Sequence, residues 1–215
     1  MKDQINHHLT DALLMAYSAG NLPEAFNLTV AAHVSMCDEC RARLGAFDSL
    51  GGVLVEETEA VEMSSGSLNA VMERLKEPVE GPKMQNKNKG ILPSPLQDYI
   101  GGDLDSVRWR SVGMGVKQAI LPTSRDATAR LLFIPAGAAV PDHGHRGTEL
   151  TLVLKGAFAD EVDHFGPGDI EVANEDLNHT PVADIGEDCI CLAATDAPLK
   201  FKGLIPRLAQ PFLRI

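Results

Sequence analysis

The sequence predicts a two-domain protein, in which a small all-α helical bundle is followed by an all-β domain with the architecture of a jelly-roll barrel. Two observations carry this prediction. Apolar residues recur at helical spacing before about residue 78 and with a period of two after about residue 98. A stretch rich in Pro, Gly, Asn and Lys separates the two patterns. We therefore expect a helical domain over 1–78, a linker over 79–97 and a β-barrel over 98–215.

Four helices are expected in the first domain, because apolar residues at helical spacing alternate there with cap and stop signals. In chain order they run from the N-cap Thr10 to Gly20, from Asn21 and Pro23 towards His33, through Cys40 to Gly51-Gly52, and over 67–76 up to Pro78. The acidic segment 53–66 fits either a loop or a frayed helix. Its glutamates, between Glu56 and Glu62, are expected to form a solvated face.

Short strands are expected in the second domain, because apolar and polar residues alternate there between Gly, Pro and Asp turns. The expected strands are 107–109, 130–134, 150–154, 170–173 and 189–193. Closing such strands into a barrel removes exposed sheet edges. The mouth of the barrel then offers a concave site for a metal ion or a ligand.

Charge limits the classes of partner. The chain has 215 residues and a formal net charge of -11, and residues 1–78 hold 12 acidic against 5 basic side chains. Direct nucleic-acid binding is disfavoured, because Lys and Arg must neutralise phosphates, so a basic protein partner fits better. No run of about 18 apolar residues and no apolar signal-peptide core occurs. We expect a cytoplasmic protein without a membrane anchor, whose four cysteines are reduced and serve as metal ligands or buried thiols.

The pattern His33-x3-Cys37-x2-Cys40 predicts a metal site in the helical domain. On a helix these positions share one face, and zinc favours four Cys and His ligands. The fourth ligand is then an imidazole, with His7 and His8 as the candidates. The alternative is that the two cysteines only fill the core. A closed zinc site would staple this short helical domain, since metal binding is coupled to folding.

This pattern, with a histidine before it on the first helix, resembles the signature of the zinc-binding anti-sigma factors. The stretches 7–14, 22–26 and 37–43 are similar to the first domain of that family. The resemblance implies that His8 is the fourth ligand beside His33, Cys37 and Cys40. It also implies that residues 1–78 bind a sigma factor of the extracytoplasmic-function (ECF) type and block its contact with core RNA polymerase.

The stretch Gly137-x5-His143-x-His145-x3-Glu149-x6-Gly156 resembles the first motif of the cupins at every named position. Two histidines on one strand face and a glutamate at the start of the next strand can reach a common point. The resemblance implies a cupin barrel around a metal ion.

A second cupin motif should add another histidine. The turn 165–169 resembles the beginning of this second motif. The gap between the turn and the histidine is longer than usual here, and the resemblance implies that His179 is the ligand. His164, beside the turn, is expected to be solvated. Three imidazoles and one carboxylate suit Zn, Fe, Mn or Ni, and likeness to the anti-sigma family favours zinc, hence two zinc ions per chain.

Cys189 and Cys191 fall on one face of an expected strand. They are interpreted as core residues, with a redox pair as the alternative, because neighbouring positions on one strand face are poorly placed for a disulfide. Trp109 is likewise expected to pack in the core.

The function that accounts for both metal patterns is that of an anti-sigma factor rather than an enzyme. Its zinc-containing helices would sequester an ECF sigma factor and release it under oxidative stress, with singlet oxygen as the expected signal received by the cupin domain. The alternative is a cupin metalloenzyme, a dioxygenase or isomerase, whose N-terminal zinc module serves oligomerisation. That alternative leaves the anti-sigma signature unexplained, and no catalytic residue is assigned.

Overall fold

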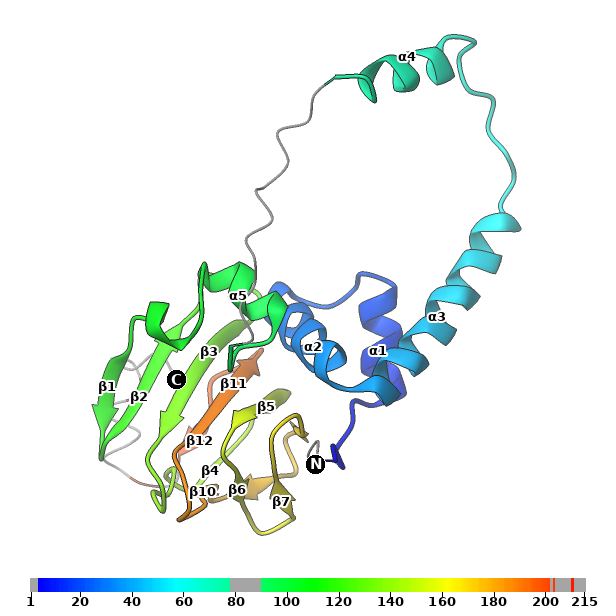
Figure 1. The fold of residues 1–215 in the computed structure, drawn as a ribbon. Coiled ribbons are helices and arrows are strands. Elements are labelled where there is room, and N and C mark those ends of the chain that lie inside the picture. The colour runs from blue at the N-terminus through cyan, green and yellow to red at the C-terminus, as the bar shows by residue number, and fades with distance from the viewer. Residues whose placement is uncertain (1–3, 78–89, 202, 204–209, 211–215) are drawn as a thin grey trace.

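The computed structural model describes residues 4–77, 90–201, 203 and 210, and it shows a group of helices beside an antiparallel β-barrel (Figure 1). The predicted fold class, a helical bundle followed by a jelly-roll barrel, is confirmed. Most of the predicted linker, residues 79–89, lies outside the described residues, as does Pro78, the predicted stop of the fourth helix.

Three of the predicted helices form about where the sequence places them. Helix α1 spans Asp11–Ser18, α2 spans Glu24–Met36 after Pro23, and α4 spans Ser67–Arg74. The hydroxyl of Thr10 caps α1 by accepting from the amide of Leu13 at 3.3 Å. Of these three helices only α1 has a side-chain cap, since Pro23 and Gly66, the N-cap residues of α2 and α4, make no side-chain cap hydrogen bond.

Helix α3 spans Asp38–Glu56, so the prediction that it ends near Gly51-Gly52 was wrong. Neither glycine adopts the left-handed conformation that would end a helix. Each costs about 1 kcal/mol of helix propensity relative to alanine, yet the backbone bonds continue to Glu57, whose amide donates to the carbonyl of Val53. The glutamates of the acidic segment are exposed, as expected.

A short helix that the sequence did not predict, α5, spans Ser94–Ile100. Its first turn contains a proline, which is pre-organised for that position, and it ends at Gly101 with φ 82°. A single 3₁₀ turn, η1, follows at Leu104–Ser106.

The barrel is built from one large and two small antiparallel sheets (Figure 1). The large sheet has the order β1 (Arg110–Gly113), β2 (Val116–Ile120), β3 (Thr128–Ile134), β11 (Cys189–Thr195), β5 (Glu149–Lys155), β8 (Ile170–Ala173). The small sheets have the orders β10 (Val182–Ala183), β6 (Phe158–Ala159), β7 (His164–Phe165) and β12 (Lys200–Phe201), β4 (His143–Gly144), β9 (Asn178–His179). Long connections between distant strands are typical of a jelly roll.

Four of the five expected strands are present, but the one predicted at 107–109 was wrong, since the first strand begins at Arg110. The amide of Trp109 instead bonds locally to the carbonyl of Val107 at 3.1 Å. The Trp109 ring packs edge-on against Phe133, with ring centroids 6.1 Å apart. The expectation that Trp109 is a core residue is therefore confirmed.

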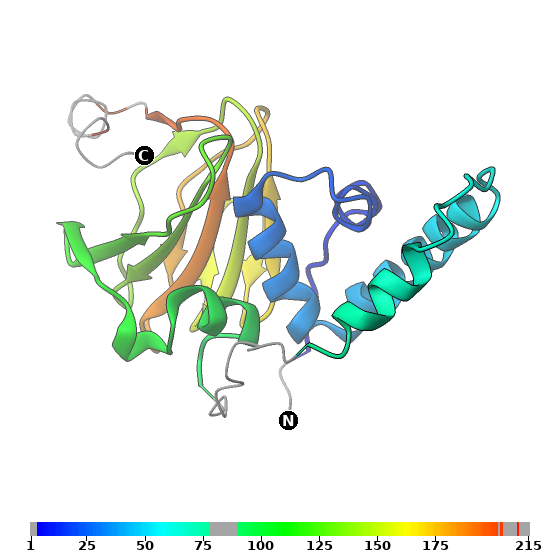
Figure 2. The ribbon, with the colours of Figure 1, turned by 90° about the horizontal axis from the view of Figure 1, so that it is seen from above.

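The large sheet separates two environments because side chains alternate along each strand. On β3, Ala129 and Leu131 join a core that also contains α2, whereas Arg130 and Leu132 line the barrel interior. Helix α2 lies along the outer face of this sheet (Figure 2). It contacts β11, β3, β5 and α5. The helices and the barrel therefore share one hydrophobic core, and α2 is apolar nearly all round because neighbours surround it.

The turn between β7 and β8 receives the N-terminal segment. The carboxylate of Asp169 accepts from the amides of Asn6 and His7 at 2.6 and 2.9 Å. Gly168 has φ +91°, and a Cβ there would lie 2.6 Å from the Ile5 side chain. A side chain at this position would be strained by both its backbone conformation and the lack of space.

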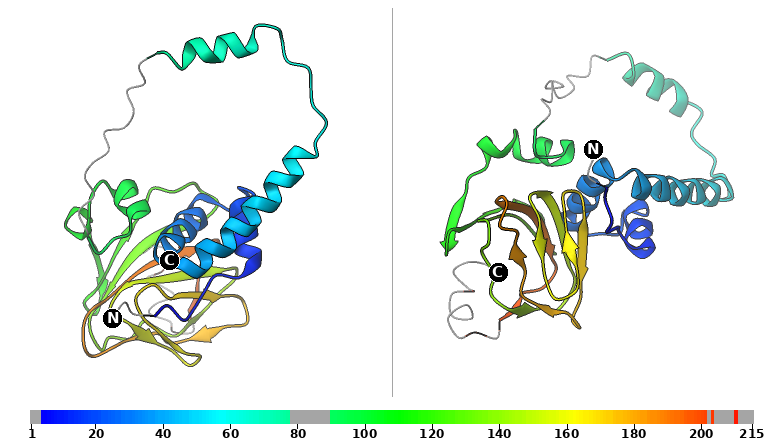
Figure 3. Two further views of the ribbon diagram at one scale, coloured as in Figure 1. Left: turned by 45° about the vertical axis from the view of Figure 1, so that its right-hand side comes forward. Right: turned by 60° about the horizontal axis from the view of Figure 1, so that its bottom comes forward.

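The end of α3 and all of α4 extend away from the barrel, as Figures 1 and 3 show. Helix α4 contains no buried residue. Among the described residues, none of the helices has the length and apolarity needed to cross a membrane.

Candidate metal sites

The helical part brings His8, His33, Cys37 and Cys40 together, with one ligand atom from each within 4.8 Å of the others. The Nδ1 atom of His8 lies 3.3 Å from the Cys37 sulfur, and Nε2 of His33 lies 3.2 Å from the Cys40 sulfur. We call these four residues the helical cluster. They come from the segment before α1, from α2, and from the start of α3.

Both imidazoles of the helical cluster are oriented by contacts on their far side. Nδ1 of His33 donates to the carbonyl of Gly168 at 3.0 Å, and Nε2 of His8 lies 3.3 Å from a carboxylate oxygen of Glu39. The remaining ring nitrogens therefore face the two sulfurs. Burial lowers the pKa of His33 to about 4, so its ring is neutral at pH 7. Two thiols and two such nitrogens fit a tetrahedral zinc ion.

His7, the other candidate from the sequence, points elsewhere. Its Nε2 lies 3.0 Å from a carboxylate oxygen of Asp163, and its ring packs on Phe165 with centroids 4.4 Å apart. Burial alone would lower the pKa of His7, but the carboxylates of Asp163 and Asp169 raise it. His7 thus takes part in fastening the N-terminal segment to the barrel.

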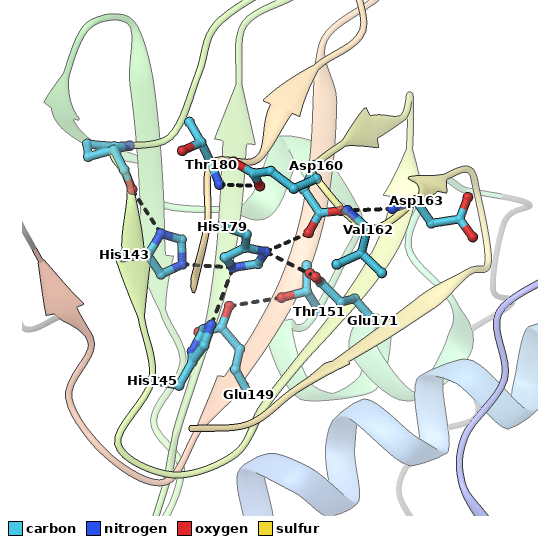
Figure 4. Close-up of polar contacts among 12 residues, drawn as sticks. His143, His145, Glu149, Thr151, Asp160, Val162, Asp163, Glu171, His179 and Thr180 are labelled. Atoms are coloured by element: carbon cyan, nitrogen blue, oxygen red, sulfur yellow. Dashed lines mark hydrogen bonds and ion pairs between the residues drawn. The ribbon is translucent and has the colours of Figure 1, made fainter. Parts of the chain in front are cut away.

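The barrel brings the three predicted histidines together (Figure 4), with ligand atoms within 4.8 Å of one another. Nε2 of His179 lies 3.2 Å from Nε2 of His143 and 3.3 Å from Nε2 of His145. His143 and His179 are direct partners in the antiparallel pairing of β4 with β9. We call these three residues the cupin cluster.

Glu149 lies beside the cupin cluster, at the first position of β5. One of its oxygens lies 3.6 Å from Nδ1 of His145, and the other accepts from the hydroxyl of Thr151 at 3.0 Å. It is not among the residues whose ligand atoms all lie within 4.8 Å of one another. The four predicted residues are therefore neighbours, with the three imidazoles in closest approach.

Asp160 and Glu171 also belong to this site, although the sequence analysis missed them. Nδ1 of His179 donates to Asp160 at 2.7 Å and lies 3.1 Å from Glu171 (Figure 4). Burial alone would lower the pKa of His179, but Glu171 and Asp160 raise it to about 9. A glutamate at an inward position of the apolar strand 170–173 was the signal that could have revealed Glu171.

The geometry of the cupin cluster fits a cation. His143 and His179 donate outward from Nδ1, to Pro141 at 2.8 Å and to Asp160, so their Nε2 atoms face inward. Converging lone pairs repel unless a metal ion or a proton lies between them. In addition, the buried Nδ1 of His145 has no hydrogen-bond partner. Imidazoles held by outer carboxylate and carbonyl acceptors are the usual arrangement around a bound metal.

The remaining predicted residues behave as structural groups. Cys189 and Cys191 are buried free thiols with their sulfurs 3.4 Å apart, and they pack with Phe158 and Phe165. Hydrogen bonding to Cys189 and burial raise the pKa of Cys191 well above its ordinary value. A core position of both thiols is therefore confirmed. His164 is exposed, as expected, and pairs with Asp184 at 2.9 Å.

Comparison with known proteins agrees with this organisation. Residues 97–198 match the family described as the ChrR cupin-like domain. The chain is 61% identical over 211 residues to the anti-sigma-E factor ChrR of Cereibacter sphaeroides, covering 98% of this chain and 99% of that protein. It is also similar to ChrR in the crystal structure of Rhodobacter sphaeroides SigE in complex with the anti-sigma ChrR, with 60% identity and a TM-score of 0.82 over 90% of this chain and 100% of that one.

Proposed function

Because the chain belongs to the family of ChrR anti-sigma factors, we propose that it sequesters an ECF-type sigma factor through residues 1–78. The observation that carries the proposal is the 61% identity along nearly the whole of both chains. The metalloenzyme alternative lacks such support, since this near-full-length relative is named as a regulator. We infer a cytoplasmic location, because such a partner works with RNA polymerase.

An exposed apolar surface supports a protein partner. On α4, Leu68, Val71, Met72 and Leu75 follow the spacing of one helix face, and Leu68 and Leu75 are 71% and 72% exposed. On α3, Leu50, Val53 and Leu54 are each at least half exposed. We call these seven residues the apolar arm. Monomeric proteins seldom leave such a surface uncovered, and an amphipathic helix commonly binds in a partner's groove.

The helical cluster holds the start of α3, from which the apolar arm extends. A zinc ion, when bound, would join three separate chain segments with a closed set of ligands. His8 draws the N-terminal segment onto α3 through its contact with Glu39, while Cys37 caps α3 by accepting from the amide of Cys40 at 3.4 Å. The direction in which α3 leaves the barrel thus depends on the same residues that form the cluster.

The segment 168–171 connects the cupin cluster to the helical cluster. The carbonyl of Gly168 holds His33, the carboxylate of Asp169 holds the N-terminal segment, and Glu171 contacts His179. A shift of Glu171 caused at His179 would therefore act on His33 through the carbonyl of Gly168, three residues before Glu171. We propose that oxidative stress, with singlet oxygen as the signal, alters the cupin site and weakens sigma binding along this segment.

The apolar arm provides the direct test. The cognate ECF sigma factor is titrated against the full-length protein, its Leu54→Asp and Val71→Asp variants, and the control Ile185→Asp, which changes a 92% exposed apolar residue of the barrel. Each arm variant should weaken binding by about 30-fold or more, as expected for a central interface residue. The control should bind like the unchanged protein. Equal binding by all four proteins would contradict the proposal.

A further inference from the structure

A cavity of about 350 Å³ lies inside the barrel, against the cupin cluster. Its wall includes His143, Glu149 and His179, which Figure 4 shows together. Most of the other described residues in its wall are apolar, among them Val116 from β2 and Leu132 from β3. A largely apolar chamber with a few convergent polar groups is typical of small-molecule sites, and this volume lies near the lower end of their range.

A buried arginine reaches this chamber. Arg130, on the inward face of β3, is only 5% exposed, and its Nη1 donates to the amide oxygen of Gln118 at 3.2 Å. Its charge lies close enough to Glu149 for the two to interact. A guanidinium stays charged in a protein interior and presents five donors in a planar fork that matches a carboxylate.

The same arginine also lines a second, more open cavity of about 490 Å³. The exposed Arg125 and Arg146 lie around this outer cavity, together with Asp126 and Asp196. The described residues around this cavity include three arginines and two aspartates, a summed formal charge of +1, on a chain whose overall formal charge is -11. Local positive charge attracts anions and raises their rate of entry.

From these observations we propose that the barrel binds a small monocarboxylic acid with an apolar chain, its carboxylate on Arg130 and its chain in the inner cavity. At about 30 Å³ per non-hydrogen atom, the inner cavity holds a molecule of about ten such atoms, the size of octanoate. This proposal goes beyond sigma binding, because it gives the cupin half a ligand of its own.

Calorimetric titration of the full-length, metal-loaded protein tests the ligand class. Butyrate, hexanoate and octanoate should bind with dissociation constants that fall about fourfold per added methylene until the chamber is full. Hexylammonium and 1-hexanol should bind at least tenfold more weakly than hexanoate, since neither places a negative charge on Arg130. Equal binding of the alcohol and the acid, or no binding of any acid at millimolar concentration, would overturn the proposal.

Two variants test where the carboxylate and the apolar chain of the ligand bind. Arg130→Gln should weaken octanoate binding at least tenfold, whereas Arg108→Gln, an exposed arginine outside both cavities, should leave it unchanged. Ala193→Leu narrows the inner chamber and should weaken octanoate while sparing butyrate. This change in chain-length preference keeps the proposal testable if Arg130→Gln fails to fold. Octanoate affinity that is the same in the unchanged protein, Arg130→Gln and Ala193→Leu would contradict it.

Discussion

The two clusters differ in what surrounds them. In the helical cluster His33, Cys37 and Cys40 are buried and His8 is half-buried, and none of the four lines either of the two cavities. The cupin cluster opens onto the inner cavity, which His143 and His179 line. A closed Cys and His set is typical of structural zinc, whereas a site with an open side can meet a small molecule. This difference supports our proposal that the first cluster stabilises the fold and that the second receives the signal.

The largest effect is expected from breaking the helical cluster. Cys40→Ala removes a ligand that is fully buried. Structural zinc contributes about 10–16 kcal/mol in zinc-finger peptides, which exceeds the stability of most domains, so we expect the helical half to unfold. The metal content should fall from about two ions per chain to about one, and helical circular dichroism should decrease.

Cys191→Ala serves as the control for this experiment, because it removes an equally buried thiol that lies in the barrel core. It should retain both metal ions. If the unchanged protein carries only one ion, or if Cys40→Ala keeps its helices, the structural role of the helical cluster is refuted.

A smaller effect is expected from loosening the contact between the two halves. Asp169→Ala removes the acceptor for the amides of Asn6, His7 and Gly166. Losing charge-assisted bonds of this kind should cost about 3 kcal/mol of unfolding free energy, measured by chemical denaturation. The control Asp105→Ala, at an exposed position of η1, should change the free energy of unfolding by less than about 0.5 kcal/mol. Equal stability of the two variants would mean that the turn does not fasten the halves.

The same carboxylate should make the contact sensitive to acid. Burial alone would raise the pKa of Asp169, but the amides of His7, Gly166 and Asn6 lower it. Its stabilising contribution is then complete above the unfolded pKa of about 3.9 and is lost as pH falls through the lower folded value. The difference in unfolding free energy between the unchanged protein and Asp169→Asn should therefore narrow between pH 5 and pH 3. A difference that widens on acidification would mean that the pKa of Asp169 is raised in the folded protein.

The smallest effect is expected from substituting His7. Comparing this variant with one at His8 shows which of the two adjacent histidines belongs to the helical cluster. His7→Ala should leave both metal ions in place, since its ring contacts Asp163 and Phe165. His8→Ala should lose the ion of the helical cluster, because Nδ1 of His8 faces the sulfurs. Elemental analysis of the two purified variants separates the roles. Loss of the same ion from both would contradict the assignment.

Sequence spacing predicted both clusters because short spacings on one helix or strand place side chains on a common face. His33, Cys37 and Cys40 follow the helical period in the sequence, although the helix is interrupted at Cys37, so that His33 lies on α2 and Cys40 on α3. His143 and His145 follow the period of a strand. His8 could not be separated from His7 by spacing, because that choice depends on how the N-terminal segment lies against the turn at Asp169. The choice of His8 came from the resemblance to the anti-sigma family.

Contacts between the helical half and the barrel could not be predicted from the sequence. No local pattern indicates that Gly168 accepts a hydrogen bond from His33, 135 positions earlier in the chain. Asp160 was missed for the same reason, since its role depends on which face of the barrel encloses His179, whereas Glu171 could have been found from its inward position on strand 170–173. The end of α3 was misjudged because two exposed glycines weaken a helix without ending it.

The affinity of the full-length protein for its ECF sigma factor, compared between Cys40→Ala and His143→Ala, tests the division of roles most directly. Each variant removes one candidate ligand from one cluster and leaves the residues of the other cluster unchanged. We predict that Cys40→Ala abolishes measurable binding, while His143→Ala binds within about threefold of the unchanged protein, because structural sites couple metal binding to folding. Equal loss of affinity in both variants, or full affinity in Cys40→Ala, would contradict the account.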